Sequence, residues 1–347
     1  MSLNDYIINN TTSLKLALKK LNRLENNFTL FVIDKNKKII GTLTDGDIRR
    51  GLIKGLKVED SVDKFAFKKF RYLKQGEVGT AKIKNFKKLK IKIVPLVNSN
   101  NQLIKLYNFA EIKTVLPLDA VIMAGGKGER LLPLTANTPK PLLKVGNKPI
   151  INYNISRLYK YGIENQFITI NYLGDQIKKY CNAQFKKINF SYVEEKKALG
   201  TIGAVKLISK FTNDYVLIMN SDLLTNIDYE DFFKTFIDHN ADMIVASVPY
   251  SVSMPYAIIE SNNAKVISFK EKPKYTYFAN AGIYIVKRQL IKLIPKNKHF
   301  NATDLMELVI KQKLNLVHYP ILSYWMDIGK HEDFEKAQKD ISHIDFD

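Results

Sequence analysis

Residues 118–220 alternate between short apolar segments with strand character and segments with helical character. The order is 120–123 (strand), 151–161 (helix), 166–171 (strand), 177–181 (helix), 190–193 (strand) and 215–219 (strand). Such alternation is typical of an α/β domain in which helices cover both faces of a mainly parallel sheet. We therefore predict a doubly wound sheet whose ligands bind outside the carboxyl ends of the strands.

The first of these strands leads directly into a glycine-rich loop. Gly125, Gly126 and Gly128 allow backbone amides to approach a triphosphate with no Cβ in the way. Arg130 follows, and Lys140 stands between two prolines that stiffen the segment presenting it. A guanidinium suits several phosphate oxygens and a lysine supplies a compact charge, so we expect both cations to act on one phosphate group. The loop is neither a Walker A motif nor a dinucleotide fingerprint.

Composition indicates a globular chain with two domains. The 347 residues can form one large and one smaller domain with separate cores. No segment approaches the ~20 apolar residues of a membrane span, and the first ten residues lack the apolar core of a signal peptide. We expect a cytoplasmic protein without membrane association. Cys181 is the only cysteine, which excludes an intramolecular disulfide.

The formal net charge of +20 suggests a nucleic-acid partner, but its distribution argues against one. Residues 1–117 hold 24 basic against 10 acidic residues, and the remainder holds 30 against 24. The lysines of the first third are scattered among Asn, Ile and Phe without a nucleic-acid-binding motif. We therefore expect a solvated basic surface and no nucleic-acid binding.

Residues 1–115 hold two copies of a strand, turn, strand and helix pattern. Strands are expected at 28–34 and 39–43 in the first copy and at 92–97 and 103–107 in the second. The helices are expected to begin at Thr44 and near Phe109.

The first copy resembles the core of a CBS (cystathionine β-synthase) motif through Gly41, Thr44 and Asp47. The resemblance implies that Thr44 and Asp47 bind the ribose of an adenine nucleotide. In the second copy, Lys105, Asn108 and Glu111 stand at the corresponding positions, which implies one competent site in each chain. The alternative is a scaffold that only dimerises.

The segment 120–150 resembles the signature of the nucleotide-sugar pyrophosphorylases, which are sugar-1-phosphate nucleotidyltransferases with a Rossmann-like core. Five later segments resemble motifs of that family in the family's order: 199–204, 220–222, 269–273, 280–284 and 325–329. The resemblance covers residue 118 to about residue 340. It implies a catalytic domain at 118–347 after a CBS pair at 1–115, and a homodimer or higher homo-oligomer.

The resemblance also implies roles for individual residues. Gly200 and Thr201 join the glycine loop in nucleotide binding, and Asp222 and Asp327 bind Mg²⁺. Lys272 holds the sugar phosphate as a third catalytic cation beside Arg130 and Lys140. The implied sugar-binding residues are Glu271, Asn280, Gly282 and Tyr256.

The reaction requires two anionic phosphates to meet, so neutralising charge is its main task. Attack of a sugar-1-phosphate oxygen on the α-phosphorus of a nucleoside triphosphate develops negative charge on the equatorial oxygens and on the departing pyrophosphate. Carboxylates suit Mg²⁺, which can neutralise this charge. The attacking phosphate is already ionised and needs no general base, so we assign no role to the five histidines.

Glu195 bears on the choice of base, because it lies five residues before Gly200, where pyrimidine-using relatives tend to carry a glutamine. A carboxylate can accept both donors on one edge of guanine, which favours GTP. A CBS pair fused to this domain resembles the glucosamine-1-phosphate guanylyltransferases of legionaminic acid synthesis. The alternatives are a mannose-1-phosphate guanylyltransferase, a glucose-1-phosphate thymidylyl- or uridylyltransferase, and a CBS-based nucleotide sensor without catalysis.

Overall fold

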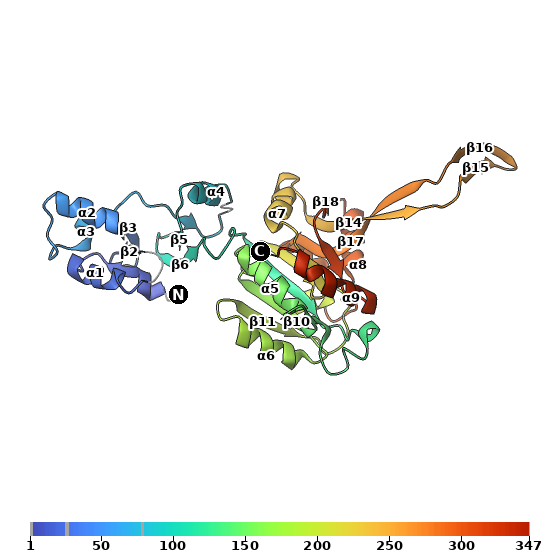
Figure 1. The fold of residues 1–347 in the computed structure, drawn as a ribbon, viewed down its shortest axis with the longest axis horizontal. Coiled ribbons are helices and arrows are strands. Elements are labelled where there is room, and N and C mark those ends of the chain that lie inside the picture. Colours follow the sequence, from blue (N-terminus) through green and yellow to red (C-terminus); the bar gives the residue numbers. More distant parts are fainter. Residues whose placement is uncertain (1–2, 25–27, 78–79, 347) are drawn as a thin grey trace. The chain divides into compact units, whose positions relative to one another are not determined.

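The computed structural model describes residues 3–24, 28–77 and 80–346, which form two compact units, Met1–Leu116 and Pro117–Asp347 (Figure 1). Each unit has its own apolar core. In the first unit, Leu14, Leu30 and Leu43 are fully buried, and in the second Val121, Val216 and Leu305 are.

The first unit contains two three-stranded sheets with the same pattern of pairing. One sheet consists of β1 (Ile7–Asn9), β2 (Thr29–Ile33) and β3 (Ile39–Thr44), and the other of β4 (Leu73–Lys74), β5 (Ile93–Val97) and β6 (Leu103–Asn108). In each sheet the first two strands are parallel and the last two antiparallel. The helices are α1 (Leu14–Leu21), α2 (Asp45–Ile53), α3 (Val62–Phe65) and α4 (Thr80–Lys88). The four strands predicted here are confirmed.

The helix expected near Phe109 is wrong. The Asn108 side chain accepts a hydrogen bond from the Ala110 amide at 3.0 Å, and the Asn108 carbonyl accepts from the Glu111 and Ile112 amides. The asparagine thus closes a turn at the end of β6, as Asn side chains commonly do. Pro117 follows within a few residues and is unfavourable inside a helix.

The second unit is built on a seven-stranded sheet in the order β11-β10-β7-β12-β17-β14-β18. Its strands are β7 (Leu118–Ala124), β10 (Asn165–Ile170), β11 (Asn189–Glu194), β12 (Tyr215–Asn220), β14 (Met243–Ser253), β17 (Lys274–Lys287) and β18 (Leu316–Pro320). Only the two pairings made by β17 are antiparallel. The predicted mainly parallel α/β sheet is confirmed.

Helices cover both faces of this sheet. Side chains of β12 alternate between the faces, and Tyr215 packs edge-on against Phe233 of α7 (Tyr229–Asp238). Val216 lies on the opposite face, in a cluster with Leu305 of α8 (Ala302–Lys311). The remaining helices are α5 (Ile150–Lys160), α6 (Gly174–Gln184) and α9 (His331–Asp340). No helix in the described part of the chain is long and apolar enough to cross a membrane.

The carboxyl ends of the parallel strands meet at one edge of the sheet. Ala124 of β7 stands opposite Ile170 of β10, which stands opposite Glu194 of β11, and Asn220 of β12 stands opposite Met123. The loops that follow these four strands therefore begin side by side, and they contain the glycine loop, Glu195 and Asp222.

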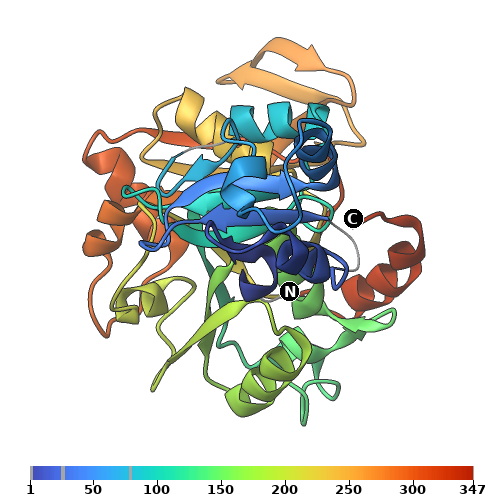
Figure 2. The same ribbon diagram turned by 90° about the vertical axis from the view of Figure 1, so that its left-hand side faces the viewer.

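Two strands of the sheet continue outward as a two-stranded ribbon. Beyond Ser247, where the pairing of β14 with β18 ends, β14 and β17 pair only with each other in the described structure. The hairpin of β15 (Ile258–Asn262) and β16 (Lys265–Lys270) follows. We call residues 248–279 the arm. Figure 1 shows the arm projecting from the second unit, and Figure 2 shows its hairpin as a separate ribbon at the top of the view.

Candidate active site

The glycine loop and Lys140 are held together at the end of β7. The Thr135 hydroxyl donates a hydrogen bond to the Gly128 carbonyl at 2.9 Å, and a Cβ on Gly128 would lie 3.1 Å from the Lys140 Cβ. Lys140 begins a short 3₁₀ turn, Lys140–Leu142, and only 9% of its surface is exposed. The lysine is therefore fixed directly beside a loop with amides available for phosphate groups.

Asp222 and Asp327 lie side by side although they are far apart in the sequence. Asp222 follows β12 and precedes β13 (Leu223–Thr225), which pairs with β19 (Trp325–Asp327) so that Leu223 is opposite Asp327. The Ile328 amide donates to the Asp222 carbonyl at 3.1 Å. The Lys140 ammonium donates to one carboxylate oxygen of Asp222, which connects the carboxylate pair to the glycine loop.

The two carboxylates meet the requirements of a divalent cation. One oxygen of Asp222 and one of Asp327 are buried without a hydrogen-bond partner. Burial raises the pKa of Asp327, and the negative charge of Asp222 raises it further, against the influence of Lys140 and Arg130. Two like charges with unsatisfied oxygens are stabilised by a cation between them.

The number of carboxylates indicates which cation fits. The described residues contain no group of three or more His, Cys, Asp or Glu side chains able to hold a metal. Mg²⁺ is commonly held by one or two carboxylates, with water and substrate phosphates as the remaining ligands. The pair of Asp222 and Asp327 fits that pattern, whereas a structural zinc site requires a closed protein shell.

The Glu195 side chain lies against Gly125, at the start of the glycine loop. A Cβ on Gly125 would come within 2.5 Å of a Glu195 carboxylate oxygen, so only glycine permits this close approach. The other oxygen accepts a hydrogen bond from the Leu199 amide at 3.3 Å. Burial raises the pKa of Glu195. An acceptor group is thus placed next to the backbone of the glycine loop.

Gly200 and Thr201 attach the neighbouring loop to the start of α8. Gly200 has a φ of +81°, and a Cβ there would lie 2.6 Å from the Phe300 carbonyl oxygen. The Thr201 amide donates to the Asn301 side chain, and the Thr201 hydroxyl accepts from the Ala302 amide at 2.8 Å. The threonine hydroxyl therefore has a structural partner in addition to the nucleotide contact predicted for it.

A cavity of about 310 Å³ is lined by many of these groups, although Asp327 is not part of its lining. Its lining includes residues of the glycine loop, the Glu195 loop and the Asp222 turn: Gly125, Gly126, Lys140, Glu195, Gly200, Thr201, Asn220, Asp222 and His299. We call this cavity the cleft. His299 was not expected here, because the residues around it form no recognisable motif.

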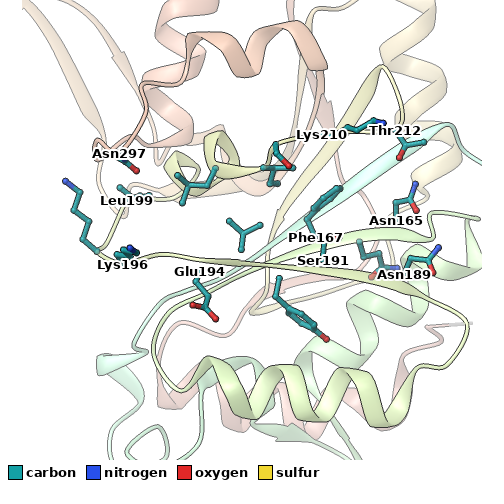
Figure 3. Close-up of a pocket in the computed structure, with 17 residues that line it drawn as sticks. Asn165, Phe167, Asn189, Ser191, Glu194, Lys196, Leu199, Lys210, Thr212 and Asn297 are labelled. Atoms are coloured by element: carbon teal, nitrogen blue, oxygen red, sulfur yellow. The ribbon is translucent and has the colours of Figure 1, made fainter.

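A larger cavity of about 1030 Å³ shares Leu199 with the lining of the cleft (Figure 3). It is lined by side chains such as Asn165, Phe167, Ser191, Lys196 and Lys210. Glu194 is the only acidic residue in this lining, so the cavity offers no carboxylate pair. The larger cavity contains Lys196, Lys197 and Lys210, but the glycine loop and Asp222 line the smaller cleft.

Two of the predicted sugar-binding residues lie near the carboxylate pair. Met219 of β12 pairs with Ile283 of β17, which places Gly282 beside the end of β12. The Asn280 side chain accepts from the Gly282 amide at 2.9 Å, and the Trp325 indole donates to the Ala281 carbonyl.

The other sugar-side residues are elsewhere. Tyr256, Glu271 and Lys272 are exposed on the arm, and none of them lines the cleft. The structure thus separates the predicted site into a core part, made by the sheet edge, and an arm part that carries the predicted sugar-phosphate lysine.

The first unit has its own cavity of about 340 Å³, formed by residues of both strand pairs. Thr44 lines it together with aromatic and basic side chains that include Phe67, Phe70, Arg71 and Lys92. Asp47 is not in this lining. Its carboxylate accepts from the Thr44 amide and hydroxyl, and it forms an ion pair with Arg50 at 2.5 Å. Asp47 therefore supports Thr44 at the start of α2.

The cleft offers glycine-loop amides and the Lys140 ammonium to phosphate groups at the carboxyl edge of a doubly wound sheet, an arrangement typical of nucleotide-dependent transferases. The family model for nucleotidyl transferases matches residues 119–343, and the chain belongs to that family. The model for the CBS domain matches residues 1–54.

Relatives of the chain include sugar-1-phosphate guanylyltransferases and, among solved structures, a putative glucose-1-phosphate thymidylyltransferase from Bacillus anthracis, which matches with a TM-score of 0.54 and 26% identity over 66% of this chain and 97% of that protein. The D-glycero-α-D-manno-heptose 1-phosphate guanylyltransferase of Aneurinibacillus thermoaerophilus is 31% identical over 65% of this chain and 99% of its own length. The mannose-1-phosphate guanylyltransferase of Mycobacterium tuberculosis is 28% identical over 65% of this chain, which spans only 64% of that enzyme. The structure of HddC from Yersinia pseudotuberculosis matches with a TM-score of 0.51 and 25% identity, over 64% of this chain and 99% of HddC. The chain is a sugar-1-phosphate nucleotidyltransferase.

Proposed function

We propose that this enzyme transfers a guanylyl group from GTP to a hexose-1-phosphate and releases pyrophosphate. The observation that carries the choice of GTP is the buried Glu195 carboxylate, which lies beside Gly125 and lines the cleft together with Asp222. A carboxylate there can accept from N1-H and N2-H₂ of guanine, and thymine and uracil lack this pair of donors. The heptose and mannose guanylyltransferases among the relatives support the same base.

In this proposal the core residues position and neutralise the triphosphate. The glycine-loop amides and Arg130 bind its β- and γ-phosphates, and Lys140 holds a compact charge near the α-phosphate. Asp222 and Asp327 would hold Mg²⁺. When bound, this ion would neutralise charge on the phosphate oxygens. Lys272 orients the sugar phosphate for in-line attack, and Glu271 accepts hydrogen bonds from sugar hydroxyls.

For the sugar, we propose glucosamine-1-phosphate, on the resemblance of the fused CBS and transferase architecture to the enzymes of legionaminic acid synthesis. The heptose and mannose substrates named for the relatives make mannose-1-phosphate the main competitor. Comparison of glucosamine- with mannose-1-phosphate as acceptors tests the choice of sugar independently of the base.

Replacing Glu195 by glutamine is expected to lower the preference for GTP over dTTP by about 5- to 150-fold in kcat/KM, the equivalent of ~1–3 kcal/mol for one bidentate base contact. The amide cannot accept from both guanine donors and is better suited to thymine. The measurement is kcat/KM for both nucleotides in the wild type and the variant.

Glu194→Gln is the matched control, because the Glu194 side chain is 68% exposed and pairs with Lys178 at the surface. Its nucleotide preference should equal that of the wild type. A wild-type enzyme that uses dTTP or UTP better than GTP, or an unchanged preference in Glu195→Gln, contradicts the proposed base contact.

We further propose that the cavity of the first unit binds an adenine nucleotide. Thr44, three phenylalanines and the basic residues Arg71, Lys90 and Lys92 supply a hydroxyl, stacking surfaces and positive charge in one cavity. Calorimetry of the full-length protein should show AMP binding that weakens about three- to tenfold in Thr44→Val, the scale of one hydrogen bond. Thr11→Val, an exposed threonine of the same unit, is the control. Absence of binding at millimolar AMP would leave only the scaffold alternative.

A further inference from the structure

The arm has little to stabilise it within its own chain. Its strands pair continuously from Val248 opposite Ala279 to Ser253 opposite Lys274, and the Met254 amide donates to the Pro273 carbonyl at 3.0 Å. Beyond this ladder, β15 and β16 pack extensively only with each other among the described elements. An isolated two-stranded ribbon is at best marginally stable in water. The arm therefore requires a surface to pack against.

The side chains of the arm are those of an interface. Tyr256 is 76% exposed, Phe269 69% and Tyr250 64%, although all three are aromatic. The five aromatic side chains of the arm that are more than half exposed leave on the order of 600 Å² uncovered. That area approaches the ~800 Å² that each partner contributes to a standard interface. Exposed hydrophobic residues scattered singly need no explanation, but five exposed aromatic side chains on one ribbon do.

The cleft lacks positive charge for its second phosphate group. Lys140 is the only lysine or arginine in its lining among the described residues, and it is paired with Asp222. The charge of the Arg130 guanidinium lowers the pKa of the Asp327 carboxyl, so Arg130 also faces a carboxylate. A triphosphate and a sugar phosphate must be accommodated together, and the lysine proposed for the sugar phosphate, Lys272, is on the arm. The core of one chain thus holds an incomplete site.

We propose that the arm docks on a second copy of this chain and places Glu271 and Lys272 at the partner's cleft. This inference rests on the sugar-phosphate role proposed for these two residues. A copy of the chain is the partner that fits, because it carries the carboxylate pair and glycine loop that these residues must complete. In its own chain the arm continues the β14–β17 pairing away from the sheet, and no arm residue lines the cleft among the described residues.

Complementation between two inactive variants tests the proposal. Asp222→Asn disables the core part of the site and Lys272→Ala the arm part, and each alone should lower turnover at least ~100-fold. The two variants are co-expressed with different affinity tags and purified through both tags. A reciprocal dimer then contains one intact composite site, so we expect about half of the wild-type turnover per dimer. Recovery below a few per cent in this doubly tagged assembly overturns the proposal, as does an active Lys272→Ala protein.

A second pair of variants tests the docking surface. Ile259 on the arm and Ile310 on α8 are both 62% exposed. Ile259→Asp should raise the KM for the sugar phosphate at least tenfold, whereas Ile310→Asp should leave it unchanged. Equal KM values for the two variants contradict docking. Failure of the proposed reaction can be distinguished from failure of docking. In the former case the wild type would release no pyrophosphate from any nucleotide and sugar-phosphate pair.

Discussion

Replacement of Asp222 by alanine, or of Asp327 by alanine, is expected to lower turnover more than ~100-fold while the protein stays folded. The two carboxylates lie side by side with unsatisfied buried oxygens, so each substitution removes half of the cation site. Neither residue is part of the apolar core. Pyrophosphate release at saturating Mg²⁺ measures the loss, and circular dichroism confirms the fold.

Asp238→Asn is the control for these variants, because Asp238 is exposed at the end of α7 and its ion pair with Lys234 is long, at 3.9 Å. Its turnover should match that of the wild type. Near-normal activity of a folded Asp222→Ala protein would eliminate the metal assignment.

Lys140→Met is expected to lower kcat by about 10²- to 10³-fold, the effect of removing one preorganised electrostatic contact to the transition state. Methionine retains the length and much of the volume of the buried lysine stem but removes its charge. Because Lys140 is close to Asp222 and the glycine loop, the loss should appear mainly in kcat.

Lys127→Met supplies the comparison, since Lys127 lies in the same loop with 69% of its side chain exposed. We expect this variant to retain wild-type kcat. Equal losses in both variants would mean that general positive charge on the loop matters and that the position of Lys140 does not.

The sequence predicted the sheet because its strands are local features. The segments around Ala120, Gln166 and Val216 are apolar runs that end in glycine or polar residues, and β7, β10 and β12 occupy these positions. The carboxyl-edge placement of the glycine loop follows from this alternation alone. The antiparallel insertion of β17 does not, because it depends on hydrogen bonds between strands about 65 residues apart, and no local pattern encodes such pairing.

The arrangement of the site was predictable only in part. Motif resemblance selected Asp222 and Asp327, but their proximity arises from the pairing of β13 with β19 across about 100 residues. Nothing in the sequence indicated that the Glu195 carboxylate lies under Gly125. Nothing in the sequence indicated that the segment 248–279 extends beyond the sheet, because this extension follows from where β18 ends.

The first unit shows the limit of repeat-based prediction. Its strand pairs recur as expected. A turn replaces the helix expected near Phe109, because the Asn108 side chain accepts a hydrogen bond from the Ala110 amide. Thr44 and Asp47 were assigned one joint role, but the cap hydrogen bonds of α2 direct the Asp47 carboxylate toward Thr44 and Arg50. Which hydrogen-bond partner such a side chain takes depends on the local geometry, and a sequence pattern does not specify that geometry.

The most direct test of the central claim is pyrophosphate release by the wild-type protein. ATP, CTP, GTP, UTP and dTTP are each supplied with glucose-, mannose-, glucosamine- or N-acetylglucosamine-1-phosphate in the presence of Mg²⁺. We predict release that depends strictly on a sugar-1-phosphate and is fastest with GTP. Release that is independent of the sugar phosphate, or fastest with dTTP or UTP, would contradict the account.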